Sequence, residues 1–241
     1  MIGFNKEKRN TQIFALFGQL VLGIHIYLFG LYYLLYIIPI SLICYHVGHS
    51  IFMHRHLAHG QFKFTNKMQF ILHIIAITCN MGKIPGYVAI HTQHHLHSGD
   101  KEDPHEWRLH GFWPIFFSEW HIEKSPMYKK WLVSSFKLTP YMKFFTNNHY
   151  LLLSLMLPIT GGIVAMCWWW KQFSVIVVHL NLGDMSHRKG NDTSTNNSWL
   201  WPIMWGDEQH TEHHLYPRRE RLCKYDLLFR LGKLLEGKTY E

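Results

Sequence analysis

Three short segments carry histidines at spacings that suit metal binding, and they are called histidine boxes here. His91–His95 and His210–His214 both read HxxHH, and a third pair, His54 and His59, is separated by four residues. On a helix, positions i, i+3 and i+4 share one face, and imidazole is the commonest metal ligand near neutral pH. The repetition predicts that the three boxes converge on metal. The eight box histidines are His54, His59, His91, His94, His95, His210, His213 and His214.

Eight imidazoles exceed what one ion needs, because structural zinc takes four ligands and catalytic zinc takes three. A nitrogen-rich site with open positions suits iron or copper redox chemistry as well as zinc. We therefore expect two ions with four or five ligands each. Di-iron helical bundles often combine a pair of ExxH motifs with further carboxylates, a pattern that this chain lacks, so nearby acids are expected to orient the imidazoles instead. These acids are Asp100, Asp103, Asp184, Asp207, Glu208 and Glu212.

The first long apolar segment leads directly into the first box. Residues 13–53 contain no Lys, Arg, Asp or Glu, and one membrane crossing needs about 20 residues. The segment predicts two crossings, at about residues 12–30 and 31–53, with a turn near Gly30. Basic residues before the segment and Arg55 after it place both ends on the cytoplasmic side.

A second apolar segment, at about residues 144–182, has Lys171 as its only charge. A turn at Gly161–Gly162 is one alternative. We favour a turn at residues 168–171, because lysine is costly in the middle of a bilayer and Trp prefers its interface. This turn gives two further crossings, at about residues 147–167 and 172–187. Four crossings in two hairpins place every box, and both termini, on the cytoplasmic side.

The remaining residues, 54–146 and 188–241, are expected to form a cytosolic helical cap that holds the two metals, within one all-α domain of residues 1–241. Residues 68–79 are apolar for about 12 residues, too few to cross a membrane, so we expect an interfacial or core helix. The Trp-rich stretch 105–143 predicts an amphipathic region at the interface. His54 and His59 lie about 140° apart on an ideal helix, so either they bridge a wide site or the helix unwinds there.

The composition agrees with a membrane protein that has a large polar part. Charged residues make up 17% of the 241 residues, below the roughly 25% of a soluble domain. The net charge is +8, but Lys and Arg flank the apolar segments, which favours an anionic membrane surface over nucleic acid. The four cysteines form no CxxC pair, so we expect neither a zinc knuckle nor a disulfide framework. The first apolar run is too long for a cleavable signal peptide.

In their order and their position beside apolar segments, the three boxes resemble those of the membrane fatty acyl desaturases. The four-residue gap in His54–His59 resembles the acyl-CoA, delta-9 branch in particular. Asp103-Pro104-His105 resembles the DPH of that branch, residues 192–199 resemble its GD-S-NNW segment, and residues 206–208 resemble its GEG lead into the last box. The resemblance covers about residues 30–217.

The resemblance implies a di-iron centre with nine histidine ligands, namely the eight box histidines and one from an NxxxH motif on the last crossing. The best match for the ninth is His187, which lies four residues after Gly183. The Asn of the family is therefore missing, with Asp184 beside Gly183, and the loop from His187 to Asp192 is shortened. His179 is the competing ninth ligand. The expected set is His54, His59, His91, His94, His95, His187, His210, His213 and His214.

The family also implies a fatty acyl substrate carried by CoA, a lipid or an acyl carrier protein. It further implies O2 as co-substrate and electrons from a separate ferredoxin or cytochrome b5, with no catalytic residue beyond the metal ligands. We expect a desaturase that introduces a cis double bond. The rivals are a hydroxylase or ketolase with the same boxes, and a membrane metal-binding protein or transporter. A transporter would line its crossings with ionisable residues, whereas these histidines gather at the ends of crossings. The missing Asn also leaves open a relative without activity.

Overall fold

The computed structural model describes residues 2–117, 140–180 and 196–237, with side chains from residue 9 onward. Within these ranges the elements are all helices and no strand occurs, as the sequence predicted. The sequence-predicted ligand His187 lies outside the described residues.

The first apolar segment forms a hairpin of α1 (Ile2–Phe29) and α2 (Tyr33–Tyr45). Gly30 makes the turn with φ +74, a left-handed conformation that glycine adopts without a Cβ clash. The predicted turn near Gly30 is therefore confirmed. Helix α2 continues into η1 (His46–Ala58), so that residues 33–58 form one helix long and apolar enough to cross a membrane.

Helix η1 is a π-helix, in which each backbone N–H donates to the carbonyl five residues earlier. Its last such bond runs from the His59 N–H to the His54 carbonyl oxygen, at 3.2 Å. A π-turn is wider than an α-turn, so residues five apart come to nearly the same face. The helix thus widens where the sequence suggested unwinding or a wide site, and the rings of His54 and His59 lie 5.0 Å apart between centroids.

The second apolar segment forms α8 (Pro140–Ser174), which continues into a second π-helix, η2 (Val175–His179). The turn expected at residues 168–171 is wrong, because these residues lie inside α8. Lys171 is only 6% exposed and lines an internal cavity. Its charge therefore lies within the protein and does not face lipid, so the cost that argued for a turn does not apply.

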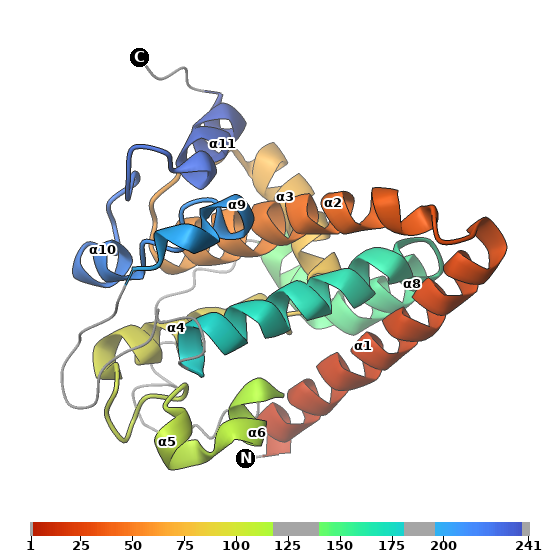
Figure 1. Cartoon of the computed structure of the whole chain (residues 1–241), viewed down its shortest axis with the longest axis horizontal. Coiled ribbons are helices and arrows are strands. Elements are labelled where there is room, and N and C mark those ends of the chain that lie inside the picture. The colour runs from red at the N-terminus through yellow and green to blue at the C-terminus, as the bar shows by residue number, and fades with distance from the viewer. Residues whose placement is uncertain (1, 118–139, 181–195, 238–241) are drawn as a thin grey trace.

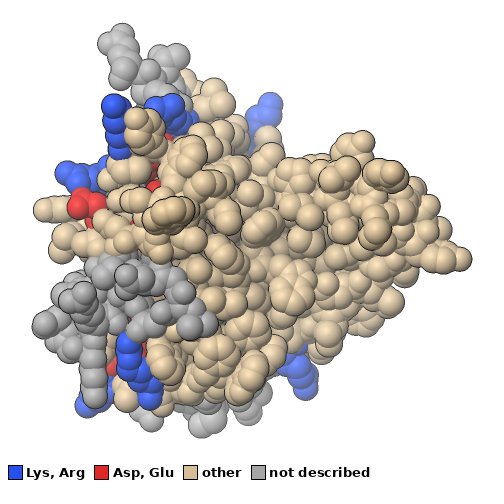
Figure 2. Space-filling model, viewed as in Figure 1, with Lys and Arg blue, Asp and Glu red and all other residues tan. Residues whose placement is uncertain are grey.

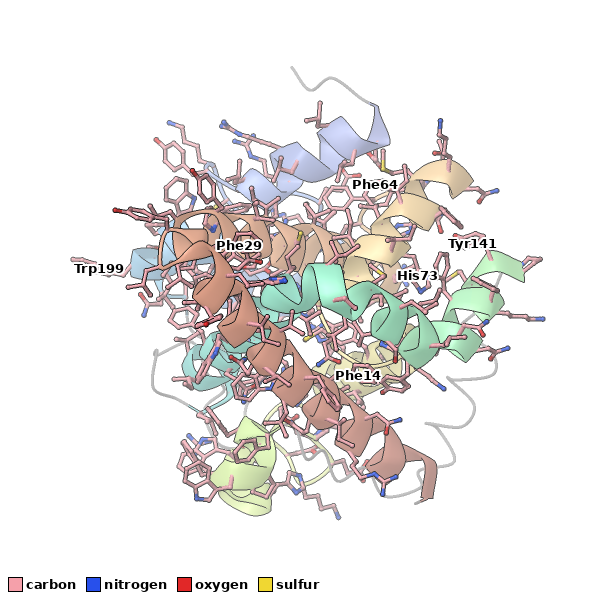
Figure 3. All side chains as sticks on the ribbon, turned by 90° about the vertical axis from the view of Figure 1, so that its right-hand side faces the viewer. Phe14, Phe29, Phe64, His73, Tyr141 and Trp199 are labelled. Atoms are coloured by element: carbon pink, nitrogen blue, oxygen red, sulfur yellow. The ribbon has the colours of Figure 1, made fainter. Side chains whose placement is uncertain are left out.

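The described residues contain three helices long and apolar enough to cross a membrane, at Arg9–Phe29, Tyr33–Ala58 and Pro140–His179. Four crossings in two hairpins are therefore not confirmed, and residues 181–187 of the expected fourth crossing lie outside the described part. Helix α8 changes direction between its green and teal portions (Figures 1 and 3). It contains Pro158 and Gly161–Gly162, residue types at which helices bend.

Small residues allow α1 and α8 to pack closely. A Cβ at Gly161 would lie 2.5 Å from the Val21 side chain, and a Cβ at Gly18 would lie 3.1 Å from the Ala165 nitrogen. A larger residue at either position would therefore push α1 and α8 apart. Close backbone approach through small residues is typical of helices in membranes.

Shorter helices build the end of the molecule that carries the histidines. They are α3 (Asn66–Thr78), α4 (Ile84–His97), α5 (Trp107–His110), α6 (Phe112–Phe116), η3 (Ser198–Leu200), α9 (Trp201–Met204), α10 (His210–Leu215) and α11 (Leu227–Glu236). Helix α3 packs against η1 and α8 and is not among the candidate spans, in agreement with the core alternative from the sequence. The core at this end joins η1, α3, α4 and α11.

The polar and apolar parts of the molecule are separated along its long axis. In Figure 1, α4 and α10 lie at one end, and the turn between α1 and α2 lies at the other. On the face drawn in Figure 2, charged side chains gather over the end with α4, α10 and α11, and the tapered end shows none. The histidine elements therefore occupy a polar cap, and the three candidate spans form an apolar wedge beneath it.

Candidate metal centre

The structure brings all eight box histidines together in two adjacent groups. Within each group, one ring nitrogen per histidine lies within 4.8 Å of all the others. The group of five consists of His54, His59, His91, His95 and His213. The group of three consists of His94, His210 and His214. The rings of His95 and His214 stack at 4.1 Å between centroids, so the two groups share a border.

Helices α4 and α10 each supply histidines to both groups. Helix α4 gives two to the group of five and one to the group of three, and α10 gives one and two. On α4, His91 and His95 (i and i+4) enter the group of five, and His94 (i+3) enters the group of three. On α10 the i, i+4 pair enters the group of three, and His213 at i+3 crosses to the group of five. Positions i and i+4 point in nearly the same direction and i+3 lies to one side of them, so each HxxHH sequence can serve two sites.

In the group of five, the Nε2 atoms point at one another. His54 and His213 are 3.0 Å apart between Nε2 atoms, His59 and His91 are 2.7 Å apart, and His95 is 2.9 Å from His213. A neutral imidazole has one N–H and one acceptor nitrogen, so five converging Nε2 atoms cannot all be satisfied by one another. Two nitrogens bound at right angles to a metal, with bonds of about 2.1 Å, would be separated by about 3 Å. The arrangement fits a shared cation.

Burial keeps these imidazoles neutral and their lone pairs available. Burial lowers the pKa of His91 and of His213 well below the usual 6.5, and the neighbouring histidines lower it further. Burial also lowers the pKa of His59 to about 4, with the Arg55 guanidinium as the second cause. Because metal binding requires deprotonated ligands, these three residues are ready to bind at neutral pH.

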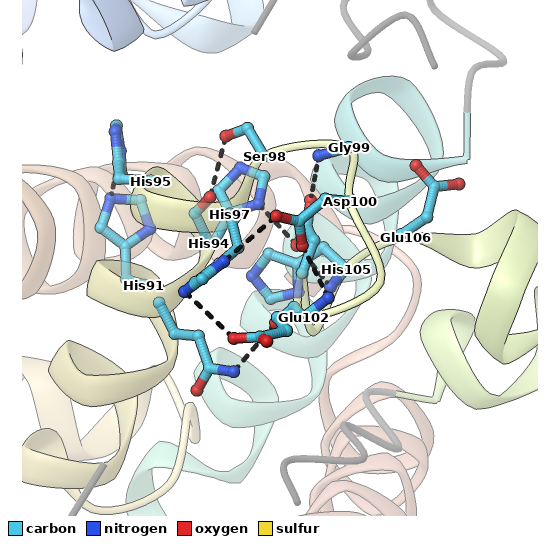
Figure 4. A network of polar contacts seen from close by, with 12 residues as sticks. His91, His94, His95, His97, Ser98, Gly99, Asp100, Glu102, His105 and Glu106 are labelled. Atoms are coloured by element: carbon cyan, nitrogen blue, oxygen red, sulfur yellow. Dashed lines mark hydrogen bonds and ion pairs between the residues drawn. The ribbon is translucent and has the colours of Figure 1, made fainter. Parts of the chain in front are cut away.

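A buried carboxylate orients His94 in the group of three. His94 Nδ1 donates to Asp103 Oδ1 at 2.9 Å, and both side chains are buried. Asp103 is itself held by the backbone N–H groups of Gly99 and His105, at 2.9 and 2.8 Å, in the loop after α4 (Figure 4). A proton on Nδ1 leaves the Nε2 lone pair of His94 for metal, as in the carboxylate–histidine pairs of metal sites.

A buried ion-pair network fixes the first box relative to the third. Arg55 is fully buried next to His54 and donates to both oxygens of Asp226, at 3.0 and 2.9 Å. It also donates to Asp207, at 3.2 Å, three residues before His210. Asp226 in turn caps α11 by accepting from the N–H of Phe229. The network joins η1, the lead into α10 and α11. Sequence reasoning used Arg55 only to orient the crossing.

The first turn of α10 is stabilised from a distance. The Asn196 side chain accepts a hydrogen bond from the Thr211 N–H at 2.8 Å, which satisfies one of the free amides at a helix start. Asn197 accepts from the Trp199 N–H and so caps η3. The asparagines of the segment 192–199 thus help to position the third box.

Two other acids of the sequence prediction pair with residues outside the boxes. Asp100 accepts from His97, and Glu212 pairs with Arg219 at the surface. Glu208 accepts from the Gly206 N–H, and burial raises its pKa. Asp184 lies outside the described residues. The π-helical geometry of η1 and η2 is the other feature that the sequence reasoning missed.

His187 and His179 are the two candidates for the ninth ligand. His187, the favoured candidate from the sequence, lies outside the described part of the chain. The His179 ring ends η2 and lies 5.5 Å from the His94 ring between centroids. It is also 4.2 Å from the ring of His105. His179 therefore sits beside the group of three, which has fewer histidines than its neighbour.

A cavity of about 150 Å³ reaches both groups. Its walls include His54, His91 and His213 of the group of five and His94 and His210 of the group of three. Its apolar lining comes from Met81, Ile90, Val175, Val178 and Met204. Tyr45 and Ser174 line it too, and the Tyr45 hydroxyl donates to the Ser174 hydroxyl oxygen at 3.1 Å. Part of an apolar chain in this cavity would lie against both groups of histidines.

The sequence is similar to those of proteins named as acyl desaturases and of an acetylenase. It is 26% identical over 214 residues to an acyl-CoA C20 Delta5-desaturase of Anemone leveillei, a match that covers 80% of this chain and 68% of that protein. It is 26% identical to the Delta-9 acyl-lipid desaturase 2 of Arabidopsis thaliana, covering 73% and 61%. It is 27% identical to a hex-5-enoyl-[acyl-carrier protein] acetylenase of Moorena producens (strain JHB), covering 70% and 62%.

The chain thus spans about two thirds of the length of these relatives, or slightly less. No family model matches the sequence.

Proposed function

We propose that this chain, whose histidine boxes resemble those of the fatty acid desaturases to which its sequence is similar, is a membrane-bound, oxygen-dependent di-iron acyl desaturase. The observation that carries this proposal is the division of eight buried or half-buried histidines into two adjacent groups that face one apolar cavity. The cavity supports a substrate with an apolar chain, and the paired groups support a two-metal oxidation. The proposed product is a cis double bond within an acyl chain.

The reaction balances as a four-electron reduction of O2. The bond –CH2–CH2– becomes –CH=CH– and gives up two electrons and two protons. A separate donor supplies two more electrons, and two further protons come from solvent, so that O2 leaves as two molecules of water. When bound, the two irons would supply the oxidising power that an unactivated C–H bond requires.

The residues of the chain would hold the two irons and position the substrate. The group of five would bind one iron, and the group of three, completed by His179 or His187, would bind the other. The position of the His179 ring, 5.5 Å from the His94 ring, favours His179. The apolar wall of Val175, Val178 and Met204 would hold the chain and exclude water, so that one pair of methylenes stays beside the metals.

We further infer that the polar cap lies on the cytoplasmic side, where the donor, a ferredoxin or cytochrome b5, would reach it. The positive charge beside the candidate spans supports this orientation. The acyl carrier remains a choice between CoA, lipid and acyl carrier protein, since the names of the three relatives include one of each kind.

The proposal is tested by gas chromatography of lipids from a host that expresses the wild type, His213→Ala or His97→Ala. His213 belongs to the group of five, and its loss should abolish the new unsaturated product. His97 pairs with Asp100 at the surface, so His97→Ala should keep the product. New hydroxyl groups in place of double bonds would indicate a hydroxylase. Metal uptake without any change in lipids would indicate a metal-binding protein or transporter.

A further inference from the structure

A cluster of exposed aromatic rings covers α5 and α6, and residues 107–117 are called the first aromatic segment. Phe112 packs against Trp113 at 5.1 Å between ring centroids, and Trp113 packs against Phe117 at 6.0 Å. Trp113 nevertheless remains 64% exposed. Leu109, Phe112 and Phe117 are exposed as well, so an apolar surface is left uncovered.

A second cluster covers η3 and α9, and residues 198–205 are called the second aromatic segment. Trp199 is 93% exposed and Trp201 is 40% exposed. In Figure 3, which looks along the molecule from its tapered end, Trp199 stands away from the ribbon at the outer edge. A Trp this exposed makes almost no contact within the chain, so packing does not account for its position.

Hydrogen bonds join both segments to the candidate spans. In the first segment, the Phe117 carbonyl oxygen accepts from Gln12, near the start of the candidate span Arg9–Phe29. The Phe116 carbonyl oxygen accepts from Gln172 near the end of α8.

In the second segment, the Ile203 carbonyl oxygen accepts from His46 Nε2 at 2.6 Å, at the point where α2 meets η1. Trp205 stacks on the same imidazole, with 4.4 Å between ring centroids. Both segments therefore pack beside the candidate spans, the first near the ends of two spans and the second where α2 passes into the π-helix that carries the first box.

Cationic side chains accompany both segments. The Arg108 guanidinium lies 5.3 Å from the centroid of the Trp107 ring. Trp201 Nε1 donates to the Tyr225 carbonyl oxygen at 2.8 Å, next to Lys224. Trp beside Lys and Arg is the combination found at the headgroup level of membranes, where the rings are amphipathic and the cations meet anionic lipids.

We propose that the two aromatic segments form one belt that lies in the lipid headgroup region on the side of the histidine groups. The occupant of this surface is the bilayer itself. The belt is continuous with the exposed apolar faces of the spans and fixes how deep the molecule sits. The second segment also supplies Met204 to the cavity wall, so the belt places the cavity at the boundary between headgroups and hydrocarbon.

The depth of the belt can be measured with nitroxide labels on the whole 241-residue chain. In this protein Cys44 is replaced by alanine and Cys223 by serine. The protein is placed in vesicles of phosphatidylcholine and phosphatidylglycerol. The signal of the same protein without any added cysteine is subtracted. Labels at Trp113→Cys, Leu109→Cys and Trp199→Cys report on the belt. Tyr36→Cys, exposed on α2, and Arg219→Cys, exposed on the cap, are the hydrocarbon and water controls.

Power saturation with oxygen and with a water-soluble nickel complex should place the belt labels between the two controls. The Tyr36 site should collide most with oxygen, and the Arg219 site most with nickel. A label at Trp113 or Trp199 that meets nickel as readily as the Arg219 site would overturn the proposal. A label shielded from both reagents would overturn it as well, because a protein contact would then cover that segment.

Discussion

A buried carboxylate orients the imidazole of His94. Its Nδ1 donates to the buried Asp103 carboxylate, which two backbone N–H groups hold in place. The carboxylate can only accept, so it fixes the proton on Nδ1 and leaves Nε2 for metal. The motif Asp103-Pro104-His105 therefore has a physical role that its sequence alone did not specify.

Asp103→Asn should weaken iron binding by the group of three. An amide can donate as well as accept, so it no longer imposes one tautomer on His94, and the loss in metal affinity should be about 10- to 100-fold. Iron retained against a graded series of chelator concentrations measures the effect. Asp100→Asn is the matched control, since Asp100 pairs with the more exposed His97. Equal retention in the two variants would mean that Asp103 does not orient a ligand.

His73 should make the protein less stable in acid. It is buried against Phe145, and burial lowers its pKa from 6.5 to about 4. Between these two values the unfolded chain binds a proton that the folded chain does not. Stability should therefore fall as the pH drops from 6.5 towards 4, by on the order of 1 kcal/mol per pH unit.

Unfolding of the iron-loaded protein in detergent, followed at several pH values, tests this expectation. His73→Leu should show a shallower dependence on pH than the wild type, and His97→Ala should not. The same slope in all three proteins would show that His73 is not the group responsible.

At the level of elements, two π-helices lead into the metal centre. Helix η1 ends one residue before His59, and η2 ends at His179. The spacing of the first box identified the chemistry but not this geometry, because propensity and periodicity assume an α-helical turn of 3.6 residues. The wider turn brings His54 and His59 to one side, with 5.0 Å between ring centroids. Long π-helices are rare and occur mostly at functional sites.

The Arg55 network should matter more to the assembly of the elements than any surface ion pair. Arg55→Leu leaves two carboxylates, Asp226 and Asp207, without their cation in a buried region. The expected loss of folding free energy is on the order of 3–5 kcal/mol. Arg219→Leu removes an exposed pair with Glu212 and should cost roughly 1 kcal/mol or less.

Thermal unfolding of purified protein in detergent compares the two arginine variants. Arg55→Lys keeps the positive charge but cannot reproduce the paired geometry, so it should lie between Arg55→Leu and the wild type. Arg55→Leu with the stability of Arg219→Leu would show that the network does not hold the boxes together.

At the level of the whole molecule, the polar cap and the apolar wedge follow from the distribution of charge along the sequence. The apolar segments, the turn near Gly30 and the gathering of all three boxes at one end could be predicted from it. The path of the second apolar segment could not. Lys171 and the neighbouring Trp residues suggested a turn at an interface, but the sequence does not show that an internal cavity receives the lysine.

The division of ligands between two groups was also beyond the sequence. Spacing shows that His91, His94 and His95 share one side of a helix, but the partner of each depends on how α4 and α10 pack. The transfer of His213 into the group of five is a property of the assembled cap. The ninth ligand depends in the same way on residues beside η2.

The most direct test of the account is the iron content of purified, iron-reconstituted protein, measured per chain with Mössbauer spectra of the bound metal. The wild type should retain two irons in two distinct environments. His91→Ala should lose one environment and His210→Ala the other, and comparison of His179→Ala with His187→Ala identifies the ninth ligand. Two results would contradict the two-group centre. One is wild-type protein that retains no stoichiometric iron. The other is a single iron per chain that is lost in both His91→Ala and His210→Ala.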